Sequence, residues 1–226
     1  MSAPGAPEAA GTSRSGAAET GGEDQLRRDV VACARSLFTR GLTHGSTGNI
    51  SVRTQGGFLI TPTGSSLGTV EPDELSLVDL TGTHLEGPKP SKEAFLHAAV
   101  LRARPGTNAV VHTHSTHAAA VSCLDGLDPA DALPPLTAYF AMRIGTLPLL
   151  PYHAPGDTAL EALAEDTARS YLAMLLSNHG PVVAGATLSA ALDALEELEE
   201  TAKLHLLLTG HRTRPLTPHE AARLAP

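Results

Sequence analysis

The chain has 226 residues, with 24 acidic side chains against 16 lysines and arginines and a formal net charge of −8 at pH 7. This acidic balance, with no Lys/Arg cluster and only four Phe and three Tyr, argues against nucleic acid as a partner. No apolar run approaches the roughly 20 residues that span a bilayer, so we expect no membrane partner either.

The first 24 residues are rich in Ala, Gly, Ser, Pro and Glu, and they lack the charged start and apolar stretch of a signal peptide. We therefore expect a disordered tail over residues 1–24 and a single domain over residues 25–226. Cys33 and Cys123 are far apart and neither has a nearby cysteine partner. Reduced thiols in a cytoplasmic protein fit this usage better than a disulfide framework.

Apolar residues at helical spacing predict a first helix from Gln25 to Arg40, ended by Gly41. Short β-prone segments and turns follow, and a Gly/Pro-flanked loop at residues 87–93 then leads into a second helix at 93–104. Further helices are predicted at 116–124, 157–170 (capped by Asp157) and 187–209, and strands at 50–53, 57–61, 76–80, 109–114, 146–151, 171–176 and 182–185. We see no internal repeat, and this mixture indicates one α/β domain.

Three histidines lie within six residues at the end of a buried-looking strand, in the segment Asn108-Ala-Val-Val-His-Thr-His-Ser-Thr-His117. Side chains alternate across a strand, so His112 and His114 point to the same face and could chelate a divalent ion. His117 lies beyond the expected strand end and is left outside the ligand set. Taken alone, a histidine on an apolar segment is more often a hydrogen-bonded core residue than a metal ligand.

Two further residues could complete this site. His179 leaves an apolar strand at a turn set by Gly180 and Pro181, where an imidazole can project over a sheet edge. Glu93, at the start of the helix before the histidine strand, could serve as a fourth ligand or as an acid/base. Three histidines and a carboxylate form an open catalytic site for Zn²⁺, with Mn²⁺, Co²⁺ or Fe²⁺ as alternatives.

Two loops, at residues 45–49 and 63–66, offer backbone N–H groups, hydroxyls and an amide with little side-chain bulk. Ser91 and Lys92 stand at a helix start, whose dipole favours negative charge. Together these groups could bind a phosphate. Either loop alone could be merely a turn.

In order and spacing, several segments resemble the class II aldolase/L-ribulose-5-phosphate 4-epimerase superfamily. They are Gly48-Asn-Ile-Ser, Ile60-Thr-Pro-Thr-Gly, Gly87-Pro-Lys-Pro-Ser-Lys-Glu, Ala109-Val-Val-His-Thr-His-Ser and Asn178-His-Gly-Pro. The resemblance covers about residues 26–210. It implies an α/β fold, a three-layer α/β/α sandwich around a central, largely antiparallel mixed sheet, and usually a homotetramer with active sites between subunits.

The resemblance also implies roles for single residues. His112, His114 and His179 match the metal ligands, and Glu93 matches a residue that can ligate the metal and act as acid/base. The positions that match the phosphate site of the related fuculose phosphate aldolases are Asn49, Thr63, Gly64 and Ser91. Tyr139 matches a catalytic tyrosine that the neighbouring subunit contributes.

Within the superfamily the chain looks most like the 3-oxo-tetronate 4-phosphate decarboxylase branch. This implies a cytoplasmic lyase of carbohydrate metabolism that releases CO₂ and dihydroxyacetone phosphate through an enediolate, with one divalent ion per subunit. An aldolase or epimerase acting on a ketose phosphate is the alternative, followed by a non-catalytic adducin-like module. Lys92 stands where the aldolases commonly have serine, and no tyrosine follows Tyr171; both departures favour a phosphorylated sugar-acid substrate.

Overall fold

The computed structural model describes residues 15–224, and within this range eight strands form one sheet in the order β4-β3-β2-β1-β5-β8-β7-β6. The strands are β1 (Asn49–Thr54), β2 (Gly57–Ile60), β3 (Ser76–Val78), β4 (His84–Glu86), β5 (Ala109–His112), β6 (Leu149–Leu150), β7 (Ala173–Leu176) and β8 (Gly180–Gly185). All neighbouring pairs are antiparallel except β6 and β7, which run parallel. The expected largely antiparallel mixed sheet is confirmed.

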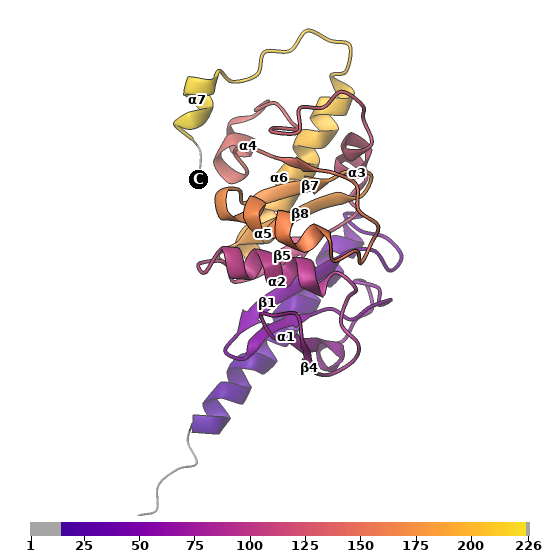
Figure 1. Cartoon of the computed structure of the whole chain (residues 1–226), viewed down its shortest axis with the longest axis vertical. Helices are drawn as coiled ribbons and strands as arrows, with labels where there is room; N and C mark the ends of the chain where they lie inside the picture. The colour runs from indigo at the N-terminus through magenta and orange to yellow at the C-terminus, as the bar shows by residue number, and fades with distance from the viewer. Residues whose placement is uncertain (1–14, 225–226) are drawn as a thin grey trace, which may run out of the picture.

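Helices cover both faces of this sheet (Figure 1). One face packs against α1 (Ser15–Thr39), α3 (Thr116–Ser122), α4 (Ala138–Arg143) and α6 (Leu188–Leu207), and the other against α2 (Ala94–Ala103) and α5 (Leu160–Ser170). Strand β5 shows the alternation that makes this possible: Ala109 and Val111 join the first core, while Val110 joins the second. The expected three-layer sandwich is therefore confirmed, and the second core lies on the side of α2.

The N-terminal boundary differs from the expectation. Residues 1–14 of the expected tail lie outside the described residues, but residues 15–24 are helical because α1 begins at Ser15 instead of Gln25. Val30, Ala34 and Leu37 bury one side of this helix against the core. A helix that is held by packing extends at little cost, because each added residue brings its own hydrogen bond.

Local polar signals account for most of the other differences. Asp157 forms a turn in which its Oδ1 accepts from the N–H of Ala159, so α5 begins at Leu160 instead of at Asp157. The unexpected α4 is capped by the side chain of Thr137. A capping box of Thr217 and Glu220 starts α7 (Pro218–Ala222), so the helix expected over residues 187–209 is not the last one.

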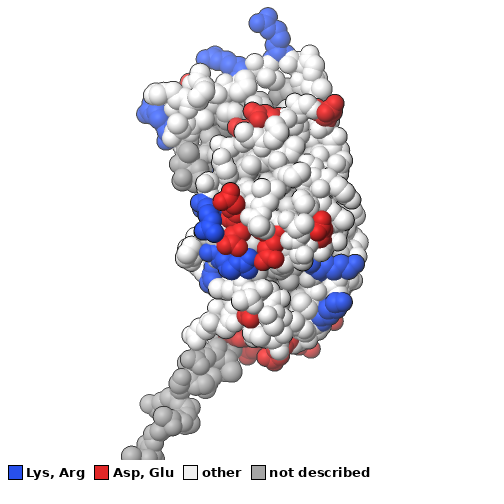
Figure 2. All heavy atoms as spheres, in the orientation of Figure 1, with Lys and Arg blue, Asp and Glu red and all other residues white. Residues whose placement is uncertain are grey.

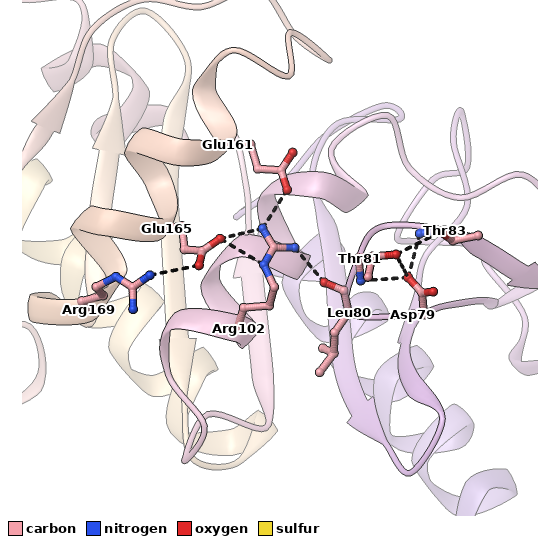
Figure 3. Close-up of polar contacts among 8 residues, drawn as sticks. All are labelled: Asp79, Leu80, Thr81, Thr83, Arg102, Glu161, Glu165 and Arg169. Atoms are coloured by element: carbon pink, nitrogen blue, oxygen red, sulfur yellow. Dashed lines mark hydrogen bonds and ion pairs between the residues drawn. The ribbon is translucent and has the colours of Figure 1, made fainter.

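Arg102 connects α2 with α5 and with the loop after β3 (Figure 3). From α2 its guanidinium lies 2.7 Å from carboxylate oxygens of both Glu161 and Glu165 on α5, and it donates to the Leu80 carbonyl beside the β3–β4 turn. In the face seen in Figure 2, basic and acidic groups intermingle across the layer formed by α2 and α5. None of the helices among the described residues is both long and apolar enough to span a bilayer.

Candidate metal centre

Three imidazoles meet at the end of β5, on the side of the sheet that α2 covers. The ring centroids of His112, His114 and His179 lie 4.5–5.1 Å from one another, and one nitrogen of each lies within 4.8 Å of the other two. Strand β5 ends at His112, so His114 follows the strand instead of lying on it as expected. The structure nevertheless brings the three predicted ligands together.

Two glycines allow other backbone segments to approach the histidine segment closely. A Cβ at Gly180 would lie 2.3 Å from the Thr113 carbonyl oxygen, and one at Gly48 would lie 2.8 Å from the His112 carbonyl oxygen. Gly48 also has a φ of +79°, which disfavours any larger residue. Gly48 precedes β1 and Gly180 begins β8, and these two strands pack on either side of the histidine segment. Neither position has room for a larger residue, which explains the glycines in the sequence motifs.

The turn between β7 and β8 presents His179. Asn178 adopts a φ of 54°, a left-handed conformation that asparagine tolerates better than most residues. Ser122, at the end of α3, accepts from the N–H of Asn178 through its carbonyl and from the N–H of His179 through its Oγ. The turn is thus held in place from α3, which itself begins two residues after His114.

Hydrogen bonding and burial prepare the imidazoles for a metal ion. The Nδ1 of the buried His112 lies 2.8 Å from the Pro181 carbonyl oxygen, so this nitrogen donates and Nε2 faces the cluster. Burial and the charge of neighbouring imidazoles lower the pKa of His114 to about 3 and that of His179 to about 4. Neutral imidazole is the form that binds a metal ion.

Glu93 closes the cluster from the N-cap of α2. One carboxylate oxygen lies 3.3 Å from His179 Nε2 and the other 3.4 Å from His112 Nε2. Burial alone would raise the pKa of Glu93, but the interactions with His112 and His179 and a hydrogen bond from Asn49 together hold that pKa below its ordinary value. The carboxylate is therefore ionised at neutral pH and complements a cation at the imidazoles.

The cluster opens into a cavity of about 250 Å³. Its lining includes all of the expected anion-binding residues, which are Asn49, Thr63, Gly64, Ser91 and Lys92. Backbone hydrogen bonds join the two loops that carry most of them, from Thr63 N–H to the Lys89 carbonyl and from Ser91 N–H to the Thr61 carbonyl. Small polar groups and residues of the candidate metal centre thus line the same cavity.

Lys92 is the basic residue of this lining. Its aliphatic stem runs beside the turn at Pro155 and Gly156, where an added Cβ would lie 3.5 Å from the Lys92 Cβ. None of the ion pairs among the described side chains involves Lys92. Its charge is therefore available to an anionic ligand.

Two residues lie apart from the cavity. Tyr139 is 60% exposed on α4 and lines a separate hollow with Arg143 and Glu197. Its expected action from a neighbouring subunit stays a prediction. His117, which was left outside the ligand set, pairs through Nδ1 with Glu199 at 2.8 Å. Glu199 also accepts from the N–H groups of His117 and Ala118, so this pair holds the start of α3.

Sequence reasoning missed His97, which is not among the metal-ligand or anion-binding residues expected above. This side chain is fully buried, and burial together with the charge of His112 lowers its pKa to about 3. It contacts Ser51 and Asn49 through its two ring nitrogens. The spacing to Glu93 was the available signal, because residues i and i+4 share one helix face.

Comparison with known proteins places this geometry in a family. Residues 28–206 match the family described as "Class II Aldolase and Adducin N-terminal domain". The chain belongs to this family. It is 46% identical over 204 residues to the 3-oxo-tetronate 4-phosphate decarboxylase of Pectobacterium atrosepticum, covering 90% of this chain and 94% of that protein. Identity to the L-fuculose phosphate aldolase of Escherichia coli K12 is 34%, over 81% of this chain and 83% of that enzyme.

Solved structures agree with the sequence comparison. The crystal structure of YgbL from Klebsiella pneumoniae matches with a TM-score of 0.87 and 45% identity over 89% of this chain and 98% of that chain. An L-fuculose 1-phosphate aldolase matches with a TM-score of 0.82 and 26% identity, over 89% of this chain and 94% of that chain. The class II aldolase fold expected from the sequence is confirmed.

Proposed function

We propose that the protein is a metal-dependent carboxy-lyase that converts 3-oxo-tetronate 4-phosphate to dihydroxyacetone phosphate and CO₂. The observation that carries the proposal is one cavity lined by His114 and His179 of the histidine cluster, the Glu93 carboxylate and the Lys92 ammonium. Relatives with this activity in their names are 44–46% identical to the chain, against 34–35% for those named as fuculose phosphate aldolases.

The residues present fit a divalent ion. Each imidazole offers one nitrogen to a common point, and the hydrogen bond from His112 to Pro181 fixes which of its nitrogens is free. Glu93 adds a negative charge at the same point. Three imidazoles and a carboxylate suit Zn²⁺ best, with Mn²⁺, Co²⁺ and Fe²⁺ as the alternatives that a metal analysis would distinguish.

The reaction breaks the bond between C1 and C2 of a 3-oxo acid, and its electron pair moves toward the 3-oxo oxygen as CO₂ leaves. A divalent ion held by the three histidines supplies positive charge that stabilises the negative charge developing on the substrate oxygens. Glu93 is ionised in the free protein, so it first takes up a proton from solvent. It then delivers this proton to C2, which completes the product.

The substrate carries two anionic groups, a phosphate and a carboxylate. The small residues Asn49, Thr63, Gly64 and Ser91 bind the phosphate through N–H and hydroxyl groups, as such loops and helix starts favour. Lys92 then faces the second anion, the carboxylate that is lost. A serine at this position, as in the related aldolases, would offer no such charge.

The alternative function is that of an aldolase, which would use the same site to cleave a ketose phosphate to an aldehyde and dihydroxyacetone phosphate. CO₂ release from each enantiomer of 3-oxo-tetronate 4-phosphate, with and without chelator, tests the two directly. We expect chelator-sensitive release from one enantiomer. A new sugar phosphate from dihydroxyacetone phosphate and an aldehyde, with no CO₂ from either acid, would favour the aldolase. Folded protein that binds no metal and turns over neither substrate would favour the non-catalytic module.

The assembly proposed with this function is a homotetramer in the cytoplasm. Tyr139, exposed on α4, reaches the cavity of a neighbouring subunit in such an assembly and assists proton transfer there. Sedimentation of the purified protein tests the assembly. Tyr139→Phe tests the role, because it removes the hydroxyl and leaves the ring available for packing.

A further inference from the structure

We infer that His97 is a positioning residue for the reaction: its buried ring fixes the side-chain amide of Asn49 so that the amide N–H points at the carboxylate of Glu93. The inference rests on the proposed function for the meaning of turnover, but not for the geometry. His97 is neither one of the three imidazoles of the cluster nor itself a residue of the cavity lining. Its effect passes through Asn49.

A continuous chain of hydrogen bonds carries the effect. Ser51 Oγ lies 2.7 Å from His97 Nδ1, and His97 Nε2 lies against Asn49 Oδ1. Asn49 Nδ2 then donates to Glu93 Oε2 at 2.8 Å and to Ser91 Oγ at 3.1 Å. The chain begins in the core and ends at the proposed acid/base.

The donors and acceptors along this chain fit together in only one way. Both amide hydrogens of Asn49 are used by Ser91 and Glu93, so its Oδ1 must accept. His97 must therefore carry its proton on Nε2, and its bare Nδ1 accepts from the Ser51 hydroxyl. If the Asn49 amide were rotated by half a turn, its oxygen would face the Glu93 carboxylate, and a buried acceptor would oppose a buried charge.

The location of His97, Asn49 and Ser51 in the fold also supports a positioning role for His97. Asn49 begins β1 directly opposite His112 on β5, while His97 lies one helical turn beyond Glu93 on the inner face of α2. His97 and Ser51 are fully buried and Asn49 is 4% exposed. An apolar side chain of similar size could fill the core at residue 97, but it could not fix the direction of the amide.

Three substitutions at residue 97 separate hydrogen bonding from packing. His97→Gln places a donor near the position of Nε2, His97→Asn reaches only toward Ser51, and His97→Leu makes neither bond. We expect His97→Leu and His97→Asn to lower kcat about 10–100-fold, the usual cost of losing a partner behind the residues that touch a metal or substrate. His97→Gln should recover most of kcat, and in the other two variants the fall in kcat should exceed any rise in KM that follows from the place of Asn49 in the cavity lining.

A double-mutant cycle tests whether Asn49 carries the effect. In the Asn49→Ala background, His97→Leu should cause no further loss of kcat, because the amide that it orients is gone. The same cycle measured on the affinity for Zn²⁺ gives a readout without substrate. A wild-type protein that binds Zn²⁺ but releases no CO₂ would refute the proposed function while the Zn²⁺ cycle still tests His97.

The tautomer of His97 is the readout that a merely structural role would not require. ¹⁵N NMR of histidine-labelled, metal-free protein, with the His97 signals assigned by loss in His97→Gln, should show a protonated Nε2 and a bare Nδ1. A proton on Nδ1 would overturn the inference, because Nε2 could then only accept from a rotated amide. Equal effects of His97→Leu with and without Asn49, or a His97→Gln variant as impaired as His97→Leu, would overturn it as well.

Discussion

Acidification should destabilise the metal-free protein through His97, and the size of the effect can be worked out from its burial. The ring is fully buried and its pKa is about 3 in the folded protein, against an ordinary 6.5 that applies to the unfolded chain. Between these two pH values the unfolded chain binds the extra proton, so stability is complete above about pH 6.5 and is lost as the pH falls. Each pH unit costs about 1.4 kcal/mol per group, which gives ~2 kcal/mol between about pH 7.5 and pH 5.

Urea unfolding of wild type and His97→Gln in the presence of chelator measures this loss. His114 and His179, whose pKa values are also depressed, steepen the acid loss in both proteins and cancel in the difference. Glutamine does not titrate, so the stability of wild type relative to the variant should fall by ~2 kcal/mol between about pH 7.5 and pH 5, at unchanged m-values. Two parallel pH profiles would show that the ring is not held neutral, and would refute the reasoning.

Three substitutions probe the site itself. Glu93→Gln should lower turnover by ~10²–10⁴-fold while metal content largely survives on three imidazoles, and near-normal turnover would exclude the acid/base role. Lys92→Ser should raise KM for the acid substrate, and an unchanged KM would remove Lys92 from substrate binding. Gly180→Ala places a Cβ 2.3 Å from the Thr113 carbonyl oxygen, so urea unfolding should show a loss of about 1–3 kcal/mol; Gly106→Ala, where a Cβ meets nothing within 4 Å, is the matched control.

The histidine cluster was predictable because its signals are local. His112 and His114 lie at the end of one apolar strand, and His179 follows another, next to a glycine and a proline that indicated a turn. The turn is at residues 177–179, and Gly180 and Pro181 already begin β8. Strand β5 pairs with β8, so the ends of these two segments meet at one edge. The strand was expected to end at residue 114, but β5 ends at His112. The predicted cluster still forms, because the chain keeps its direction for a residue or two beyond a strand.

His97 was not predictable in the same way, because its spacing from Glu93, the one local signal, does not by itself distinguish it from a histidine on a helix surface. Its partners Asn49 and Ser51 lie more than forty residues away, and only the packing of α2 over β1 brings them together. Short elements such as β4 and α4 were not predicted for a related reason. They have too few residues to show a hydrophobic period, and only their capping residues or strand partners define them.

The histidine cluster and the loops that line the cavity belong to different parts of the fold, and under the proposed function this separation explains how one family can serve two reactions. His112 and His114 lie at the end of β5, and His179 lies in the β7–β8 turn. Gly180 follows directly, and a larger residue there would clash with the Thr113 carbonyl oxygen. The groups that would contact substrate, by contrast, lie on the loops at 45–49, 61–64 and 87–92, which face the cavity. Loops tolerate substitution better than packed strands, so a serine-to-lysine change at residue 92 can add a charge without moving a metal ligand. Cleavage to an aldehyde and loss of CO₂ both leave an electron pair to be stabilised at the same centre, and the loops decide which leaving group is presented to it.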